Sequence, residues 1–230
     1  MKKILLLLTL ATCLNFAVNA QDKSVSYGVK AGLTFPKWAV SGQEAQQIPD
    51  AQSTPSFFFG GFADIAISQQ FSVQPGISII GKGVKYKETG TGVEQGVPYS
   101  YSGSVTISTM YLEIPINAVG KIPAGPGNVF VGAGPYFGYA LSGKTKTKVS
   151  VSAGGINGSD SSEDDLEFGS EDGEFKRVEF GLNFLGGYQL KNGLNLNLGY
   201  GLGLGNLVNN STGDGKASNR VLSIGLGFNF

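Results

Sequence analysis

Apolar and polar residues alternate with a period of two along most of the chain. Eight stretches follow this pattern, at residues 25–35, 57–67, 71–79, 110–116, 129–141, 178–184, 194–204 and 222–230. A period of two places successive side chains on opposite faces of an extended strand. No stretch has a convincing helical period. We therefore predict eight β-strands.

The connections between these stretches alternate between long and short. The long ones are 36–56, 88–103, about 144–175 and 207–217, and the short ones are 68–70, 120–127 and 191–193. Tight turns on one side and long loops on the other are typical of transmembrane β-barrels. The predicted fold class is all-β: an eight-stranded antiparallel transmembrane β-barrel with short periplasmic turns and long extracellular loops.

The two faces of the predicted strands differ in a way that excludes an ordinary hydrophobic interior. One face is bulky and apolar, and the other is rich in Gly, Ser and Asn; glycine accounts for 36 of 230 residues. A soluble up-and-down barrel buries its apolar face, whereas a membrane barrel turns that face to lipid. Because lipid leaves no solvent for an unpaired edge, the last strand is expected to pair with residues 25–35.

Proline residues interrupt three of the predicted strands. Pro75 and Pro115 are expected near the periplasmic rim, and Pro135 lies closer to the middle of its strand. Because proline lacks the N–H that a ladder hydrogen bond needs, we predict a β-bulge at Pro135.

The N-terminal segment has the features of a secretory signal peptide. Lys2 and Lys3 precede an apolar run, and small residues precede the junction of Ala20 and Gln21. The run is short for a membrane-spanning helix, so a signal peptide is favoured over a membrane anchor. We predict a signal peptide at 1–20, a barrel domain at 21–230 and an outer-membrane location.

Composition removes several classes of function. The single cysteine, Cys13, lies in the predicted signal peptide, and the chain has no histidine. Cys nucleophiles, Cys/His metal sites and His-dependent triads are therefore not expected. Without Lys2 and Lys3 the chain has 15 basic and 17 acidic residues, a net charge of −2, which gives no sign of nucleic-acid binding. We expect no cofactor and a monomer.

Five charged residues are expected to face the lumen: Lys30, Asp64, Lys82, Glu113 and Glu179. Charges in a narrow lumen are costly unless they are paired. The favoured interpretation is a structural plug, because eight strands enclose a lumen that side chains can fill. A proton or ion path, or paired catalytic carboxylates, are the alternatives.

The long connection 144–175 has the most unusual composition in the chain. It begins with Lys144, Lys146 and Lys148 at alternate positions and ends in an acidic run. We predict that the strand continues beyond the membrane and that the acidic arm returns to pair with these lysines. The connection is also the expected site for an unknown protein or surface partner. A divalent cation is a weaker hypothesis, because the spacing does not match an EF-hand loop.

The C-terminal stretch resembles a signal for barrel assembly. Its pattern of a polar residue, a glycine and two aromatic residues falls at Ser223, Gly225, Phe228 and Phe230. It resembles the C-terminal signal read by the outer-membrane barrel-assembly machinery, which is therefore an expected partner during biogenesis, together with outer-membrane lipid.

Several stretches resemble the PorT-like outer-membrane β-barrel family of Bacteroidetes-type bacteria. They are "YLEIPINAVGK" (111–121), "GAGPYFGYALSG" (132–143), "VEFGLNFLGGYQL" (178–190), "YGLGLGNL" (200–207) and the terminal "GFNF". The resemblance implies an eight-stranded outer-membrane barrel but no defined activity. The founding member is associated with protein secretion, and no residue here transfers that role.

The expected function is a non-enzymatic, structural or interaction role through the extracellular loops. The first alternative is a narrow channel for small solutes, and the second is a component associated with a secretion or envelope-assembly apparatus. An outer-membrane enzyme would have to use a carboxylate mechanism, with Glu113 and Glu179 as nominal candidates.

Overall fold

Nine antiparallel strands make up the part of the chain that the computed structural model describes, residues 25–42, 51–209 and 215–230. They are β1 (Val25–Ser41), β2 (Ser56–Ala66), β3 (Phe71–Glu94), β4 (Val97–Ala124), β5 (Gly127–Ala153), β6 (Ile156–Asp165), β7 (Val178–Leu190), β8 (Leu194–Gly203) and β9 (Lys216–Asn229). Within these ranges no helix is long and apolar enough to cross a membrane. The predicted signal peptide, its junction at Ala20 and Gln21, and parts of connections 36–56 and 207–217 lie outside the described residues.

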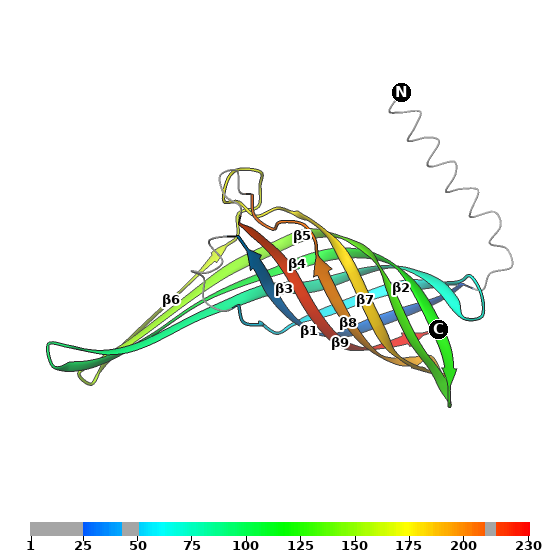
Figure 1. The fold of residues 1–230 in the computed structure, drawn as a ribbon, viewed down its shortest axis with the longest axis horizontal. Coiled ribbons are helices and arrows are strands. Elements are labelled where there is room, and N and C mark those ends of the chain that lie inside the picture. The colour runs from blue at the N-terminus through cyan, green and yellow to red at the C-terminus, as the bar shows by residue number, and fades with distance from the viewer. Residues whose placement is uncertain (1–24, 43–50, 210–214) are drawn as a thin grey trace, which may run out of the picture.

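Eight of the strands close into a ring, in which each strand pairs with the next and β9 returns to β1 (Figure 1). The order around the ring is β1, β2, β3, β4, β5, β7, β8, β9. The closing pairing runs from Gly28 opposite Asn229 to Ser41 opposite Lys216. β6 lies outside the ring and pairs with the far end of β5. This topology confirms the predicted eight-stranded antiparallel barrel.

The apolar side of each ring strand faces outward. On β9, Leu222, Ile224 and Leu226 are exposed, whereas Gly225 and Gly227, at alternate positions, are buried against the lumen. The large apolar side chains of β7 and β8 are exposed in the same alternating way. A barrel made for water has the opposite arrangement. The outward face of the ring therefore suits hydrocarbon, as the sequence pattern predicts.

Two of the connections expected to be loops are largely β-structure. Residues 88–103 belong to β3 and β4, which meet at a two-residue turn where Gln95 and Gly96 have φ angles of 50° and 84°. Positive φ at both positions is the geometry that joins twisted strands most tightly. The strand extension predicted after Lys144 is confirmed, since β5 runs to Ala153 and β6 returns beside it.

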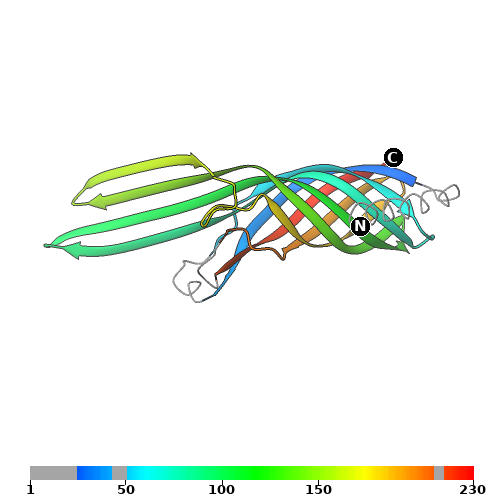
Figure 2. The same cartoon turned by 90° about the horizontal axis from the view of Figure 1, so that it is seen from above.

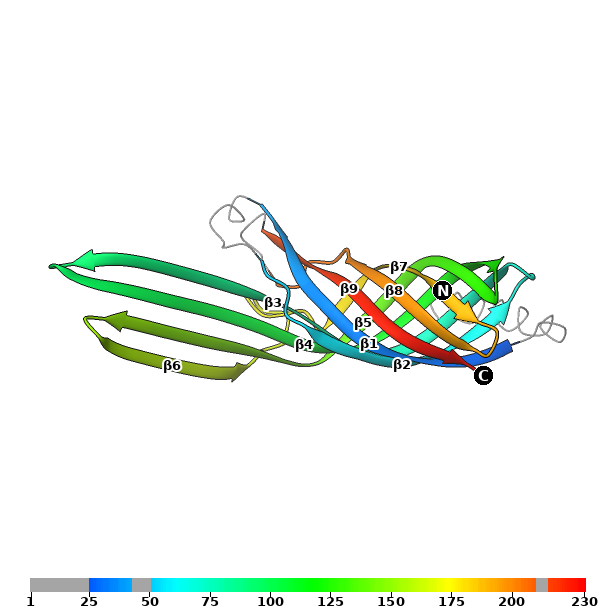
Figure 3. The ribbon, with the colours of Figure 1, turned by 90° about the horizontal axis from the view of Figure 1, so that it is seen from below.

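These extensions form a four-stranded sheet that continues beyond the rest of the barrel (Figures 2 and 3). We call it the projecting sheet, made of residues 85–94 of β3, 97–108 of β4, 144–153 of β5 and 156–165 of β6. Its register is continuous with that of the barrel along β3, so the lumen-facing and outward-facing sides of β3 extend into it unchanged.

The bulge predicted at Pro135 is wrong. Pairing between β4 and β5 keeps one register across this residue, from Pro115 opposite Tyr136 to Ala118 opposite Ala133. The ladder has only a local gap there, because the missing proline N–H removes a hydrogen bond without adding a residue. The register shift lies between Met110 and Tyr111 instead, which pair with Ser142 and Ala140.

Two glycines and one aromatic ring form the seam where the barrel closes. Gly32 of β1 and Gly225 of β9 lie opposite each other, and Phe58 of β2 lies opposite Gly32 on its other side. A Cβ atom on Gly225 would lie 2.5 Å from the backbone oxygen of Ala31 and 2.6 Å from the buried Phe58 ring. The ring of Phe58 therefore occupies the space that side chains would need at the seam.

A methyl group at this seam is expected to oppose closure of the barrel. Gly225→Ala should destabilise the folded barrel by about 1–3 kcal/mol, as overpacking of a tight interior does. The measurement is the fraction of protein with heat-modifiable gel mobility after refolding in detergent, followed through a urea titration.

Gly103→Ala is the matched control for this change, because a Cβ atom there would meet nothing within 4 Å. Equal refolding and equal urea midpoints for the two alanine variants would contradict the assigned role of the seam.

Candidate functional site

A buried ion-pair network crosses the lumen. Lys82 of β3 is 2% exposed, and its Nζ atom lies 2.9 Å from Oε2 of Glu113 on β4 and 3.1 Å from Oε2 of Glu179 on β7. Glu113 and Glu179 are 6% and 1% exposed. Each of the three residues lies at an inward position of its strand. The period of two places all three side chains on the lumen face, and the register of the strands brings them to one level of the barrel.

Neutral polar groups complete the hydrogen bonding of the two carboxylates. The Tyr136 hydroxyl donates to Oε1 of Glu179 at 2.8 Å, and the Asn219 amide donates to Oε2 of Glu179 at 3.0 Å. The Asn183 amide donates to Oε1 of Glu113 at 3.2 Å. One ammonium faces two carboxylates, so these donors stabilise the remaining negative charge. The network joins β3, β4, β5, β7 and β9 across the lumen.

Two tyrosine rings lie beside the ammonium group. The Nζ atom of Lys82 is 4.4 Å from the centre of the Tyr136 ring and 5.0 Å from that of Tyr111. Both rings are buried. Cation–π attraction is stronger where water is excluded. The rings therefore stabilise the ammonium and also fill the lumen at its level.

The other two predicted lumen charges do not join this network. Asp64 is buried and forms an ion pair with Lys121 of β4. Lys30 lines a cavity beside Glu113, but among the described residues no carboxylate oxygen lies within 4.0 Å of its Nζ atom. Sequence reasoning missed Lys121, because it fell in a stretch assigned to the connection 120–127.

The neutral members of the network were not predicted from the sequence either. Tyr111 lies two positions before Glu113, and Tyr136 two positions before the inward-facing Gly138. A spacing of two residues from an inward-facing position was the available signal that each tyrosine faces the lumen. It was obscured for Tyr136 by the adjacent Pro135, since a bulge there would have reversed its direction.

A cavity of about 100 Å³, lined by both polar and apolar side chains, lies in the lumen next to the network. Its lining includes Lys30, Gln74, Asn117, Asn183, Asn195 and Asn197. The Oγ atom of Ser78 and the Oδ1 atom of Asn117 also border it, and neither has a hydrogen-bond partner among the described residues. These two polar atoms suit water as a partner, so this part of the lumen is a candidate wet compartment.

The residues of the expected assembly signal divide between the two faces of β9. Ser223 and Gly225 lie on the lumen side, and Phe228 and Phe230 face outward with ring centres 5.3 Å apart. The Phe230 N–H donates to the Tyr27 carbonyl at 2.8 Å, which ties this end of β9 to β1. Recognition of these residues by the assembly machinery stays a prediction.

The projecting sheet contains part of the predicted lysine–acid pairing. Lys144 and Lys146 lie 2.7 and 3.5 Å from oxygens of Glu163, whereas Lys148 lies opposite Ser161. The hydrogen bond from Lys144 lowers the pKa of the Glu163 carboxyl group, but such exposed pairs contribute little stability. Within the described part of the chain, no group of three or more His, Cys, Asp or Glu side chains could hold a metal ion.

Comparison with known proteins places this geometry in a family. The model of the outer membrane protein beta-barrel domain matches residues 19–209. No curated protein sequence matches the chain.

The chain is also similar, at low identity, to several solved structures. OprG of Pseudomonas aeruginosa is 10% identical with a TM-score of 0.42, over 92% of this chain and 98% of that one. Neisserial surface protein A is 15% identical with a TM-score of 0.39, over 90% and 99%. The attachment invasion locus protein Ail of Yersinia pestis is 13% identical with a TM-score of 0.35, over 89% and 98%. On the match over residues 19–209, the chain belongs to the outer membrane protein beta-barrel domain family.

Proposed function

We propose that this protein is a non-enzymatic outer-membrane barrel whose lumen is sealed and whose function lies in interactions of the projecting sheet. The observation that carries this proposal is the sheet itself, in which β3, β4, β5 and β6 continue well past the ends of the other strands. These strands are longer than crossing a membrane requires. Their outer parts expose side chains beyond the membrane that are not needed to close the barrel. Their surface is therefore available to a partner.

The lumen network supports a structural role for the buried carboxylates. Glu179 has hydrogen bonds or an ion pair on both oxygens, and Glu113 is held by Lys82 and Asn183. A catalytic carboxylate needs an oxygen that reaches substrate or an attacking water. On this ground we propose that both glutamates are structural, with Glu113 also bordering the cavity beside the network.

The sequence supports a more specific family, a signal peptide and a monomeric state. We propose a PorT-like barrel, on the strength of Tyr-Leu-Glu-Ile-Pro at 111–115 and Gly-Pro-Tyr-Phe-Gly-Tyr at 134–139. In this proposal a signal peptide at 1–20 directs the chain to the outer membrane, where it functions as a monomer. Association with a secretion or envelope-assembly apparatus is compatible with a binding role of the projecting sheet.

A narrow channel for small solutes is the alternative function, and the cavity beside the network favours it. A channel needs a continuous aqueous path, and the network crosses that path with Lys82, Tyr111 and Tyr136. The two functions therefore differ in whether ions pass this level of the lumen.

Planar bilayer recordings separate these functions. The purified mature protein should insert without producing stepwise currents in concentrated KCl, because the lumen is filled by buried side chains at the network. Reproducible single-channel steps from a homogeneous preparation would replace the proposed function with the channel.

Removal of the central ammonium is expected to destabilise the barrel. Lys82→Met leaves two buried carboxylates without their cation, and breaking a buried pair in this way costs about 3–5 kcal/mol. The measurement is the free energy of unfolding in detergent micelles from denaturant titration.

Two further variants control this measurement. Lys191→Met removes an exposed lysine at the β7–β8 turn and should leave stability unchanged. Adding Glu113→Gln and Glu179→Gln to Lys82→Met should recover part of the lost stability, because the network then no longer contains two carboxylates without their cation. Equal unfolding midpoints for Lys82→Met and Lys191→Met would contradict the structural role of the network.

A further inference from the structure

Seven cationic side chains occupy outward positions immediately beyond the apolar band of the barrel. On β1, Lys37 follows the exposed Leu33 by four positions, and on β9 Arg220 precedes the exposed Leu222 by two. We call the whole set the cationic girdle: Lys37, Lys85, Lys87, Lys144, Lys146, Lys148 and Arg220.

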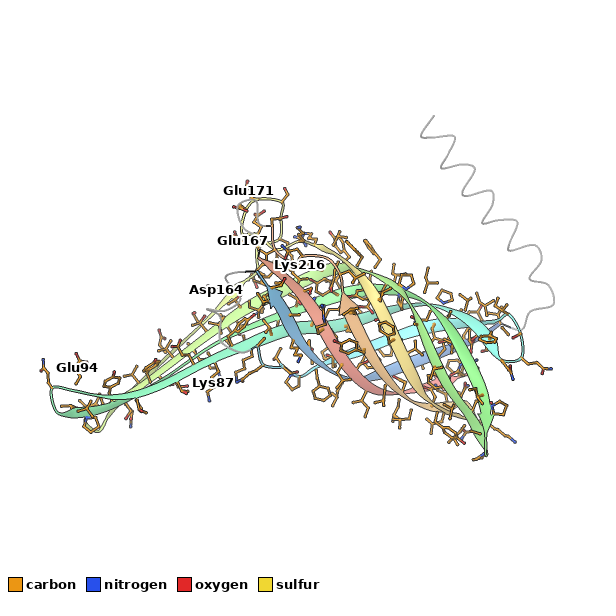
Figure 4. The ribbon with its side chains drawn as sticks, in the orientation of Figure 1. Lys87, Glu94, Asp164, Glu167, Glu171 and Lys216 are labelled. Carbon is orange, nitrogen blue, oxygen red and sulfur yellow. The ribbon has the colours of Figure 1, made fainter. Side chains whose placement is uncertain are left out.

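The register fixes the direction in which these side chains point. Along β3 the inward Lys82 and Val84 are buried, so Lys85 and Lys87, at odd positions, lie on the face that carries Ile79. Figure 4 shows Lys87 pointing away from the sheet. On β5 the register shift keeps Lys144, Lys146 and Lys148 on the outward face as well. The girdle therefore continues the surface that faces lipid.

The girdle carries more positive charge than its own acidic neighbours neutralise. Glu163 contacts Lys144 and Lys146. Among the described residues, no carboxylate oxygen lies within 4.0 Å of the cationic nitrogens of Lys37, Lys85, Lys87, Lys148 or Arg220.

Like charges also face each other within the girdle. Lys37 lies directly opposite Arg220 across the closing pair of strands, and like charges in such a pair destabilise a sheet. The Arg220 guanidinium donates to the Gly203 and Asn219 carbonyls and to the Ser218 hydroxyl, none of which carries a charge. Lys85 and Lys146 lie in one row on either side of Thr106, and Lys87 and Lys148 lie in the next row. Two strand spacings separate the lysines of each row by about 10 Å, close enough for their charges to act together.

Hydroxyl and amide side chains occupy the next rows outward. One row is Thr89, Ser102, Ser150 and Ser159, and the next is Thr91, Ser100, Ser152 and Asn157. These side chains line a shallow depression on the outward face of the projecting sheet. Along one continuous surface the order is thus apolar, then cationic, then rich in hydroxyl groups.

We propose that this outward face binds the phosphate-bearing headgroup of a glycolipid in the leaflet that surrounds the barrel. Acyl chains contact the apolar band, phosphates contact the cationic girdle, and sugars contact the hydroxyl rows. A lipid headgroup is favoured over an acidic protein because the girdle lies on the lipid-facing side and directly adjoins the hydrocarbon band. This proposal deepens the proposed function, on which it rests, by naming the chemistry that the projecting sheet recognises.

Binding of a purified diphosphorylated lipid A to the detergent-solubilised mature protein tests the proposal, with fully dephosphorylated lipid A as the comparison probe. Native mass spectrometry or a fluorescence titration gives the affinity. Lys85→Gln, Lys87→Gln and Lys148→Gln combined should weaken binding of the phosphorylated probe on the order of 10- to 100-fold, because each cation near a charged headgroup contributes substantially to attraction. The wild type should bind the dephosphorylated probe about as weakly as the triple variant binds the phosphorylated probe.

Two single variants are expected to leave binding unchanged or to tighten it. Lys191→Gln, at the opposite end of the barrel, should bind like the wild type. Glu163→Gln frees Lys144 and Lys146 and should tighten binding about threefold, a gain that damage to the fold would not produce. Heat-modifiable gel mobility verifies that each variant is folded.

The outcomes are distinct from those of the conductance test. Equal affinity of wild type and triple variant, or equal affinity for the two probes, would overturn the proposal while leaving a sealed barrel intact. Loss of affinity for the phosphorylated probe in the triple variant, with tighter binding by Glu163→Gln, supports it. Capture of an acidic protein without binding of the phosphorylated probe would assign the girdle to that partner instead and overturn the lipid proposal.

Discussion

The need to satisfy every backbone N–H and C=O group inside hydrocarbon governs this structure. A sheet in lipid has no water to bond to a free edge, and each unpaired group costs several kcal/mol. The chain meets this requirement when β9 pairs with β1 along its length, from Gly28–Asn229 to Ser41–Lys216. The even strand number in the ring and the close-packed seam follow from that closure. The apolar outward face follows from contact with hydrocarbon.

Closure with eight strands also dictates what fills the inside. The lumen is narrow, so most inward positions at the β1–β9 seam carry small side chains, and Phe58 packs over Gly32 and Gly225. On the opposite side of the ring, β3, β4 and β5 contribute Lys82, Tyr111, Glu113 and Tyr136. Small residues on one wall and large polar residues on the other let the ion-pair network reach across to Glu179 and Asn219.

The barrel was predictable because a period of two is a local signal that repeats in every membrane strand. The length of the strands was not, because glycines and polar residues at 88–103 have the composition of a loop although they pair as a hairpin. The projecting sheet does keep an alternation, since Tyr99, Tyr101, Val105 and Ile107 of β4 alternate with serine and threonine residues. The glycines and charged residues around the turn at Gln95 and Gly96 hid it.

The sequence also predicts that all five lumen charges face inward, but it does not predict which side chains they contact. Which side chains meet depends on stagger around the ring, and this separates Asp64, paired with Lys121, from the network of Lys82. Parity gives the face of a strand and not the level along the barrel axis. The same limit applies to Asn219, which reaches Glu179 from a strand 40 residues away in sequence.

Cysteine cross-linking across the closing strands tests the central claim most directly. Leu33 and Ile224 lie opposite each other on the outward face of β1 and β9. With Leu33→Cys and Ile224→Cys in the chain without residues 1–20, and so without Cys13, oxidation after refolding into lipid vesicles should give an internal disulfide. The cross-linked chain should then migrate faster than the reduced chain on a denaturing gel. Leu33→Cys with Phe228→Cys, four residues out of register, should remain uncross-linked. Failure of the in-register pair to cross-link, or equal cross-linking of both pairs, would contradict the closed barrel described here.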